Sequence, residues 1–422
     1  MMNDINIPGS KSIAARALVC RLLGGHDTVL TNLPDCGDTR GMLRLTEAVR
    51  QALRAPRSAQ RPTPAVEIGE GGTTLRFGMA ACASIPGLDI TLKGSPRLME
   101  RPHDTLMQAL RDMGADITPI PADSSLRIRG RELSGGTIRL DGSVSSQYLS
   151  ALMLAAPNWK TDTRFILEGN VVSRPYIEMT AGVMRAFGAN VGITPDSPLE
   201  ANPQFEVSVS ATGYAQCARY DIEGDWSGAS YFFELRLIAG ALAIDLPEFG
   251  MPTLKSPAES LQGDSRVAAI FADAFSILRS GSAATHDVIL NLNDAPDLVP
   301  AVAVGLCVAG LNFRIEGVAH LRHKESDRMA AIATELRRLG FVIDTGDDTM
   351  AWNGRRCEPE ASPFIRTYQD HRMAMAFAPA ALAFPTLRIE DPSVVGKSFP
   401  DFWTQLKAAC PQSEDLRLKI ED

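Results

Sequence analysis

The sequence lacks any apolar run as long as the roughly 18–20 residues that a membrane-spanning helix needs. Its opening segment, MMNDINIPGSKS, has neither the basic part nor the apolar part of a secretory signal. Basic tracts are absent, and 42 Lys and Arg residues face 50 Asp and Glu residues, which argues against nucleic acid as the main partner. The seven cysteines are scattered and form no CxxC pair, which fits reduced thiols better than a disulfide framework. We therefore expect a cytoplasmic protein with no membrane and no nucleic-acid partner.

Signals for a bound cofactor are also missing. The sequence has no P-loop, and GEGGTT (69–74) matches the GxGxxG pattern too poorly to indicate a dinucleotide. His320 and His323 form an HxxH pair, but no further Cys, His or acidic cluster in the sequence completes a metal site. The sequence therefore predicts neither a metal nor an organic cofactor.

What the sequence does contain is a recurring unit. Six times, a β-like run enters a Gly/Ser/Asp turn, and an Ala-rich apolar helix pattern follows. The turns are PGSKS (8–12), GEGGTT (69–74), DGSVSSQ (141–147), EGDWSGAS (223–230), LNDAPD (292–297) and YQDHR (368–372). Their spacing of roughly 60–80 residues leaves room for about two helices and a few strands in each unit. With 422 residues, the chain is also long enough for two hydrophobic cores, so we expect two domains.

Two kinds of helix are predicted within these units. The Ala-rich helices after the turns are apolar nearly all round, so they should be buried. The others are amphipathic and end in Gly before a β-rich run. These are DTLMQALRDMGADI (104–117), PYIEMTAGVMRAFGANV (175–191) and DRMAAIATELRRLGFVI (327–343).

The turns also hold most of the candidate binding groups. Helix N-termini present free N–H groups, which makes them anion sites, and Arg and Lys side chains bind phosphate and carboxylate. A single capped turn or a single surface cation would need no function, but a set in recurring turns indicates recognition of a multiply charged small molecule. The basic residues in or near the turns are Lys11, Arg16, Arg76, Arg97, Arg101, Arg174, Lys324, Arg328, Arg372 and Lys397.

Eight segments resemble the signature segments of the 5-enolpyruvylshikimate-3-phosphate synthases, in the order that the family has them. They are PGSKS (8–12), PRLMERP (96–102), GSVSSQYLSAL (142–152), SRPYIEM (173–179), EGDWSGASYF (223–232), KESDR (324–328), QDHRMAM (369–375) and GKSFPDFW (396–403). The resemblance implies the α/β enolpyruvyl transferase fold, an inside-out barrel of six βαβαββ-type units with the active site in the interdomain cleft. Domain one would be residues 1–8 plus 226–422, and domain two residues 9–225.

The resemblance further implies a reaction without cofactors, carried out by a monomer. The enolpyruvyl group of phosphoenolpyruvate moves to the 5-hydroxyl of shikimate 3-phosphate, and phosphate leaves a tetrahedral intermediate. This reaction belongs to the shikimate pathway, which leads to chorismate and the aromatic amino acids. It needs a base for the hydroxyl, a proton donor for the methylene carbon and several cations.

Site residues are carried over where this sequence matches the family's motifs. Asp297 matches the general base, and Glu325, helped by Lys11, is the candidate proton shuttle. Shikimate 3-phosphate would contact Lys11, Ser12, Arg16, Ser145, Ser146, Gln147, Ser173, Asp297 and Lys324. Phosphoenolpyruvate would contact Lys11, Gly72, Arg101, Gln147, Arg328, Arg372 and Lys397, while Arg76, Tyr176, His320 and His371 would lie nearby.

Several of these residues also have plain structural interpretations. Taken alone, Ser12 and Asp297 would each be read as a helix N-cap, because an apolar helix follows directly. The KESDR segment would be read as a charged helix start. The resemblance is what favours a role in binding or catalysis.

The sequence departs from the family's pattern at three positions in the motifs. Ala15 and His320 stand where the family usually has Asn. Glu70 stands in a loop that usually reads NAGT, and a carboxylate there would weaken anion binding if it pointed into the site. We therefore expect glyphosate, which occupies the phosphoenolpyruvate site in this family, to bind weakly.

Three alternatives stay open. The UDP-N-acetylglucosamine enolpyruvyl transferase shares the fold and the donor, but it usually carries a reactive Cys on a loop where this chain has GSPRLMERP (94–102). A non-catalytic relative would bind anionic metabolites without turnover, although the retained Lys11, Asp297 and Glu325 argue for catalysis. An oligomeric scaffold would need exposed apolar stripes rather than cations in turns.

Overall fold

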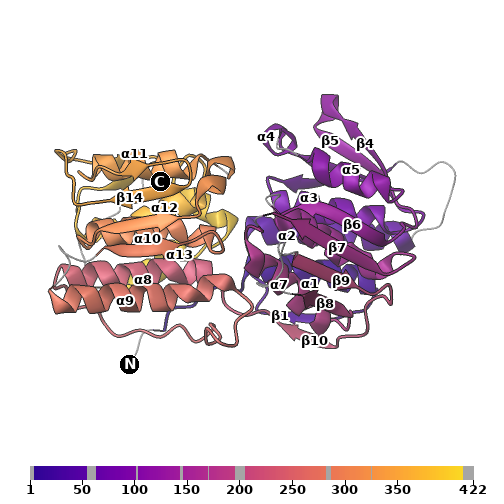
Figure 1. Ribbon diagram of the computed structural model, residues 1–422, viewed down its shortest axis with the longest axis horizontal. Helices are drawn as coiled ribbons and strands as arrows, with labels where there is room; N and C mark the ends of the chain where they lie inside the picture. Colours follow the sequence, from indigo (N-terminus) through magenta and orange to yellow (C-terminus); the bar gives the residue numbers. More distant parts are fainter. Residues whose placement is uncertain are drawn as a thin grey trace. The chain divides into compact units, whose positions relative to one another are not determined.

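The computed structural model describes residues 4–54, 63–100, 103–142, 146–169, 171–194, 205–281, 287–324 and 326–411. The chain divides into two compact units, which Figure 1 shows in orange to yellow and in indigo to magenta. Unit 1 comprises Met1–Pro8 and Glu223–Asp422, and unit 2 comprises Gly9–Ile222. Across the described ranges, no helix is long and apolar enough to cross a membrane.

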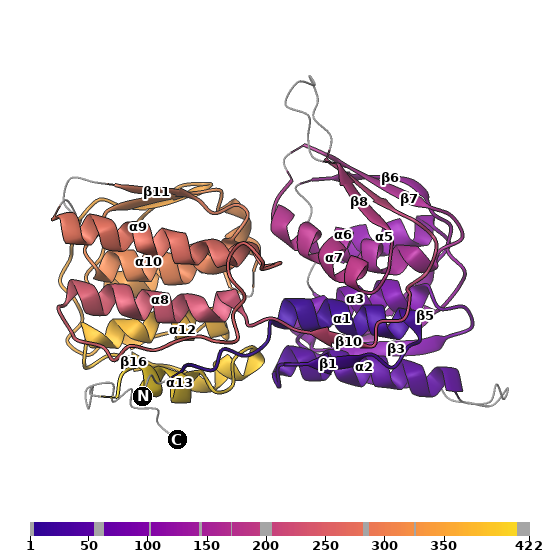
Figure 2. The same cartoon turned by 90° about the horizontal axis from the view of Figure 1, so that it is seen from below.

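Unit 2 is built around helices that lie between sheets (Figure 2). Its Ala-rich helices α1, α3 and α6 pack on one another, and α7 packs on both α1 and α6. Nearly every residue of α3 and α6 is buried, as the apolar composition of these segments predicted. The helices are α1 (Lys11–Gly24), α2 (Gly37–Arg54), α3 (Gly72–Ala83), α4 (Pro96–Met99), α5 (Asp104–Asp112), α6 (Ser146–Ala155) and α7 (Arg174–Ala186).

Two sheets of unit 2 have four strands each and share one topology. In both, the first two strands pair in parallel and the remaining pairs are antiparallel. Their orders are β2-β3-β5-β4 and β6-β7-β9-β8, and β1 pairs with β10 in a separate two-stranded parallel sheet. The strands are β1 (Val29–Thr31), β2 (Ala65–Gly69), β3 (Asp89–Gly94), β4 (Asp116–Ile120), β5 (Ser125–Arg129), β6 (Gly136–Asp141), β7 (Thr163–Glu168), β8 (Val191–Thr194), β9 (Phe205–Val209) and β10 (Arg219–Asp221).

Unit 1 repeats the same plan. Helices α8, α10 and α12 pack on one another in its interior, and α9 covers α8. All ten residues of α10 are buried, so this helix is apolar on every side because every side faces protein. The helices are α8 (Trp226–Ala241), α9 (Val267–Ser280), α10 (Val299–Val308), α11 (Arg328–Arg338), α12 (His371–Phe377) and α13 (Phe402–Ala409).

The four-stranded sheet of unit 1 has the order β11-β12-β14-β13, with the same parallel and antiparallel pairings as in unit 2. In sequence order, three segments therefore read βαβαββ: β2 to β5, β6 to β9 and β11 to β14. This confirms the recurring α/β unit. The strands are β11 (Val288–Asn291), β12 (Phe313–Glu316), β13 (Asp344–Thr345) and β14 (Thr349–Trp352), together with the parallel pair β15 (Phe364–Ile365) and β16 (Arg388–Ile389).

The amphipathic helices end as predicted. Gly114, Gly188 and Gly340 follow α5, α7 and α11 with φ angles of 103°, 76° and 89°. Side chains with a Cβ rarely adopt such angles, so Gly is the residue that stops a helix there at least cost. Each stop turns the chain toward the next strand, which completes the βαβαββ unit.

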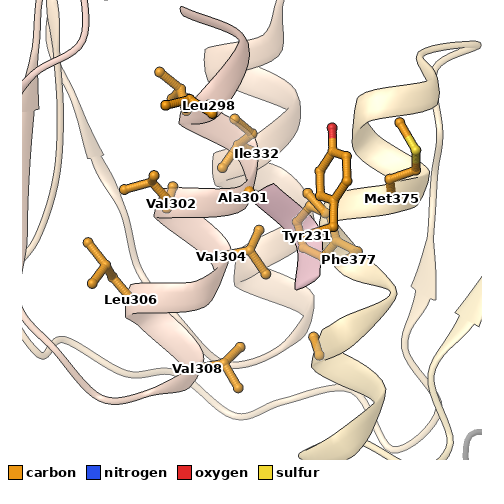
Figure 3. Packing of buried hydrophobic residues seen from close by; sticks show 14 of the residues in the cluster. Tyr231, Leu298, Ala301, Val302, Val304, Leu306, Val308, Ile332, Met375 and Phe377 are labelled. Atoms are coloured by element: carbon orange, nitrogen blue, oxygen red, sulfur yellow. The ribbon is translucent and has the colours of Figure 1, made fainter. Parts of the chain in front are cut away.

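The core of unit 1 reaches the turns from which the candidate site is built. Leu298, fully buried, belongs to the same hydrophobic cluster as Val302 and Phe377. Figure 3 shows Leu298 at one end of the cluster and Tyr231 with its hydroxyl directed away from Phe377. Packing thus fixes the backbone at Leu298, next to the candidate base Asp297.

Candidate active site

Four charged side chains form a cluster in unit 1. Arg328 Nε lies 2.7 Å from Asp370 Oδ2, and Arg328 Nη1 lies 3.0 Å from Asp297 Oδ1. Arg372 Nη2 donates to the other oxygen of Asp297 at 2.7 Å. The Arg328 side chain is 2% exposed and that of Asp297 17% exposed. Two guanidinium groups thus hold one carboxylate that retains some access to solvent.

Asp297 is not a helix N-cap, so the plain structural interpretation is wrong. It lies inside the 3-10 helix η4 (Pro296–Leu298), whose N-cap is Ala295, and α10 follows without a break. Both carboxylate oxygens of Asp297 accept from arginines instead. A carboxylate that pairs with arginines instead of capping its helix is a candidate catalytic group.

Asp370 holds the first turn of α12 and one arginine at the same time. Its carboxylate accepts from the backbone N–H of Arg372 at 3.0 Å, as an N-cap does, and binds Arg328. The two preceding residues, Tyr368 and Gln369, have φ angles of 54° and 56°, where side chains other than Gly are strained. The Tyr368 hydroxyl donates to the buried carboxylate of Glu335 at 2.7 Å, which ties this strained turn to α11.

Three further groups of unit 1 lie near the cluster. His371 is 1% exposed, and its Nδ1 lies 3.8 Å from Asp370 Oδ1. Tyr231 is buried near Arg372, and burial raises the pKa of its hydroxyl above the usual range. Burial and the nearby charge of Lys324 lower the pKa of His320 to about 4, so its ring is neutral at physiological pH.

Three predicted residues of unit 1 remain, and the structure describes two of them, Lys324 and Lys397. Lys324 is the C-cap of the 3-10 helix η5 (Ala319–His323), and Lys397 is the last residue of η7 (Pro392–Lys397). Both are partly buried, and both make interactions within the protein. Glu325, the predicted proton shuttle, lies outside the described residues.

Unit 2 contains a buried cation that has no carboxylate partner among the described residues. Arg16 is 2% exposed and uses four of its five N–H donors on neutral oxygens. These oxygens belong to Thr180, Ser12, Ser150 and Tyr176. No acidic residue in the described part of unit 2 lies within ion-pairing distance of Arg16, and burial lowers its pKa to about 10. A buried, uncompensated charge is costly, and an anion binding nearby would reduce that cost.

Arg16 also orders the helix start that carries Lys11. Its Nη1 donates to the carbonyl of Ser12 at 2.7 Å, one turn back along α1. Helix α1 begins at Lys11 with Ser10 as its N-cap, so Ser12 is not the cap that the plain interpretation would have made it. Lys11 Nζ lies 2.9 Å from Asp38 Oδ2, and the Lys11 side chain is 16% exposed. The pair holds the ammonium group at the helix start, within reach of solvent.

The start of α6 forms the second part of the unit 2 site. Gln147 accepts a hydrogen bond from Arg76 Nη1 at 2.5 Å through its side-chain oxygen. Because the oxygen of this amide accepts from Arg76, the N–H₂ group is the end of the Gln147 side chain that carries donors. Ser146 is the first residue of α6, and Ser173 is the N-cap of α7 with a φ of 55°. The predicted residues Ser145 and Arg101 lie outside the described residues.

Helix α3 begins at Gly72, directly after the altered loop. Gly71 is its N-cap, and the preceding Glu70 is exposed. The predicted neighbours Tyr176 and Arg174 belong to α7, where the Tyr176 carbonyl accepts from Arg16 and Arg174 pairs with Glu178.

Sequence reasoning missed four carboxylates or hydroxyls that organise these clusters. Asp38 and Asp370 are the partners of predicted cations, and Ser150 and Thr180 surround Arg16. Asp370 and Ser150 stand inside the QDHRMAM and GSVSSQYLSAL segments, so their places in the motifs were the available signal. Asp38 and Thr180 gave no sequence signal, because 27 residues separate Lys11 from Asp38 and 164 separate Arg16 from Thr180.

Comparison with known proteins gives one consistent result. The chain matches the family of EPSP synthase (3-phosphoshikimate 1-carboxyvinyltransferase) over residues 1–406. A 3-phosphoshikimate 1-carboxyvinyltransferase of Bacteroides fragilis strain YCH46 is 37% identical over 418 residues, which cover 96% of this chain and 94% of that protein. The enzyme of the same name from Salmonella schwarzengrund is 35% identical, with 95% of both chains covered.

Solved structures agree on the fold. An EPSP synthase from Acinetobacter baumannii superposes with a TM-score of 0.67 at 20% sequence identity, covering 96% of this chain and 95% of that one. The enolpyruvyl transferase NikO from Streptomyces tendae gives a TM-score of 0.63 at 15% identity, covering 96% and 94%. The fold is therefore the α/β enolpyruvyl transferase fold. On its sequence and its fold, the chain belongs to the EPSP synthase family.

Proposed function

We propose that this protein transfers the enolpyruvyl group of phosphoenolpyruvate to the 5-hydroxyl of shikimate 3-phosphate and releases phosphate. The observation that carries the proposal is the carboxylate of Asp297 held by two arginines, Arg328 and Arg372, in a chain similar to named 3-phosphoshikimate 1-carboxyvinyltransferases along nearly its whole length. Both substrates are anions, and the arginines supply the charge that anions need.

The unit 1 cluster accounts for the chemistry at the hydroxyl. In the addition step, the 5-oxygen bonds to C2 of phosphoenolpyruvate while its proton passes to Asp297, and the methylene carbon gains a proton. In the elimination step, the methyl group returns a proton to the group that protonated the methylene carbon, the bond from C2 to the phosphate oxygen breaks, and phosphate leaves with the proton that Asp297 had accepted. An anion bound at Arg328 and Arg372 takes up part of their charge, which frees an oxygen of Asp297 to accept the proton.

The unit 2 cluster accounts for recognition of the sugar phosphate. Lys11, Ser12, Ser146 and Gln147 lie at the starts of two helices, where free N–H groups and the helix dipole favour an anion. Arg16 acts through its charge, since most of its donors are already bonded within the protein. Lys11 and Glu325 remain the two candidates for the proton donor at the methylene carbon.

The remaining assignments are proposals of the same kind. Ser145, Ser173, Lys324 and Asp297 would complete the shikimate 3-phosphate site, while Gly72, Arg101 and Lys397 would join the arginines of unit 1 at phosphoenolpyruvate. We also propose that the protein works in the cytoplasm as a monomer, with units 1 and 2 as its two domains.

Phosphate release from phosphoenolpyruvate tests the function directly. The purified protein should release phosphate only when shikimate 3-phosphate is present. Release that requires UDP-N-acetylglucosamine instead would identify the related transferase. Binding of shikimate 3-phosphate without any release would identify a non-catalytic relative and would contradict the proposal.

Glyphosate inhibition tests the altered loop before α3. Glu70 is exposed one residue before the N-cap of α3, so its negative charge opposes an anion at that helix start. We expect half-inhibition only at concentrations well above the KM for phosphoenolpyruvate, and Glu70→Gln should lower the half-inhibiting concentration about threefold to tenfold.

The matched control for this prediction is Glu67→Gln, which removes an exposed carboxylate from the neighbouring strand β2. It should leave inhibition within about twofold of the unmodified protein. Half-inhibition of the unmodified protein well below the KM for phosphoenolpyruvate would contradict the expectation.

A further inference from the structure

Asp264 is a buried carboxyl group beside the unit 1 cluster. It lies in the 3-10 helix η3 (Gly263–Arg266) and is 4% exposed. One of its oxygens shares a short hydrogen bond with Ser227 Oγ in the first turn of α8. Asp264 also interacts electrostatically with Asp297 and Arg372. Asp264 belongs neither to the predicted site residues nor to the groups of the proposed mechanism.

The position of Asp264 is fixed by the residue before η3. Gln262 donates to the carbonyl of Gly224 and to the carboxylate of Glu223, both at 2.8 Å, and accepts from the N–H of Trp226 at 3.0 Å. These bonds clamp η3 against the start of α8. Asp264 therefore cannot move away from the charges of the cluster without breaking several buried hydrogen bonds.

Counting charges singles out Asp264 from the other acids. The cluster and Asp264 together hold three carboxyl groups against two guanidinium groups. Asp297 binds both arginines, and Asp370 binds Arg328. Among described residues, the hydrogen bond of Asp264 comes only from a neutral serine. If all three acids were ionised, these five groups would carry one excess negative charge, which opposes an anion at Arg372.

We propose that Asp264 is a positioning residue that carries the exchangeable proton of this cluster, so that Asp297 stays ionised and Arg372 stays available to an anion. Burial and the charge of Asp297 raise the pKa of Asp264 to about 7, whereas Ser227 and Arg372 oppose that rise. Above that pH, Asp264 ionises and its charge competes with substrate for Arg372. The inference rests on the proposed function.

Among the described residues, the charged groups that act on Asp264 come from three places. Asp297 comes from η4 and Arg372 from α12, while Asp225 directly precedes α8 and raises the pKa as another acid. The other titratable side chains of η3 and α9, which are Arg266, Asp273 and Arg279, are exposed. The pH response should therefore follow Asp264 and not a surface group.

The test is the pH dependence of kcat/KM for phosphoenolpyruvate between about pH 5.5 and 9 in the full-length protein. The kcat/KM of the unmodified protein should fall about tenfold between pH 7 and pH 9, because KM rises while kcat stays the same. Asp264→Asn, which mimics the protonated acid, should remove this decline. Ser227→Ala should shift the decline to higher pH, because it removes a bond that favours the ionised form.

Asp273→Asn is the control, because it removes an exposed carboxylate from α9 and should leave the profile unchanged. A decline that is the same in Asp264→Asn and in the unmodified protein would overturn the inference. If Asp264→Asn does not fold, the shift in Ser227→Ala decides, and its absence overturns the inference.

A measurement without turnover separates this inference from the proposed function. In protein labelled with ¹³C-aspartate, one carboxyl resonance should titrate near pH 7 and be missing from Asp264→Asn. Absence of such a resonance overturns the inference even if the enzyme is active. If the protein releases no phosphate at any pH but shows this resonance, the proposed function is wrong, whereas the protonation of Asp264 is supported.

Discussion

Replacing Asp297 with Asn should lower kcat for phosphate release about a thousandfold, because general base catalysis contributes roughly 10²–10⁴ to a rate. The amide of Asn cannot accept the hydroxyl proton, although it keeps the shape of the carboxylate. Arg328 retains its bonds to Asp370 in this variant, so this arginine stays in place to bind the anion. Shikimate 3-phosphate should therefore still bind, which calorimetry can measure alongside the rate.

The matched control is Asp294→Asn, three residues earlier in the same turn. Asp294 is partly buried, but it is not bonded to either arginine of the cluster. Its replacement should change kcat less than about threefold, as for a substitution that leaves the reacting groups untouched. Activity of Asp297→Asn within tenfold of the unmodified protein would show that Asp297 is not the base.

The sequence predicted the helices of the candidate site better than their contacts. Buried helices follow from composition, as in α10, and their ends follow from glycines such as Gly340. Both signals are local, so a single segment contains them. The bond from Arg372 to Asp297 joins residues 75 positions apart, and no spacing rule links such positions. Family motifs supplied Asp297 and Arg372, and the fold supplied their pairing.

Two buried acids show where local patterns stop being informative. Asp264 stands in GDSR, where no local pattern predicts its burial, because that burial depends on Gln262 and α8. Glu234 stands in the apolar pattern YFFELRLIAG, which correctly predicts a buried helix. A charged residue in such a helix was visible in the sequence. Whether it had a partner depended on the helices packed around it.

Glu234 has no hydrogen-bond partner among the described residues, although it is 0% exposed. A Cβ added at Gly305 on α10 would lie 3.0 Å from Glu234 Cγ and 3.2 Å from a ring carbon of Phe271 on α9. Burial raises the pKa of Glu234 well above 4.5, which favours the protonated form of this group in the folded protein. An unpaired buried carboxyl group costs about 2 kcal/mol or more of folding free energy.

Replacing Glu234 with Met should consequently stabilise unit 1, by about 2 kcal/mol at pH 7. Urea unfolding followed by tryptophan fluorescence reports mainly on this unit, because Trp226, Trp352 and Trp403 belong to it and only Trp159 belongs to unit 2. The comparison variant is Glu335→Met, since Glu335 is equally buried but accepts from Tyr368 and pairs with Arg338 at 3.0 Å. That variant should lose about 3 kcal/mol, because it leaves the Tyr368 hydroxyl and the Arg366 N–H without their acceptor.

The pH dependence of the same unfolding curves gives the sharpest check. Because the folded state of Glu234 binds its proton more tightly than the unfolded state, this group's contribution is fully present below about pH 4.5 and is lost as the pH rises toward its folded pKa. The loss should reach at most about 1.4 kcal/mol per pH unit, and Glu234→Met should remove it, so the stability gain of the variant should grow from pH 5 to pH 9. If the stability gain of Glu234→Met is constant with pH, or if the variant is less stable at pH 7, the carboxyl group of Glu234 has a hydrogen-bond or ionic partner in the folded protein. The core of unit 1 would then tolerate an acid because it is paired, and not because it is protonated.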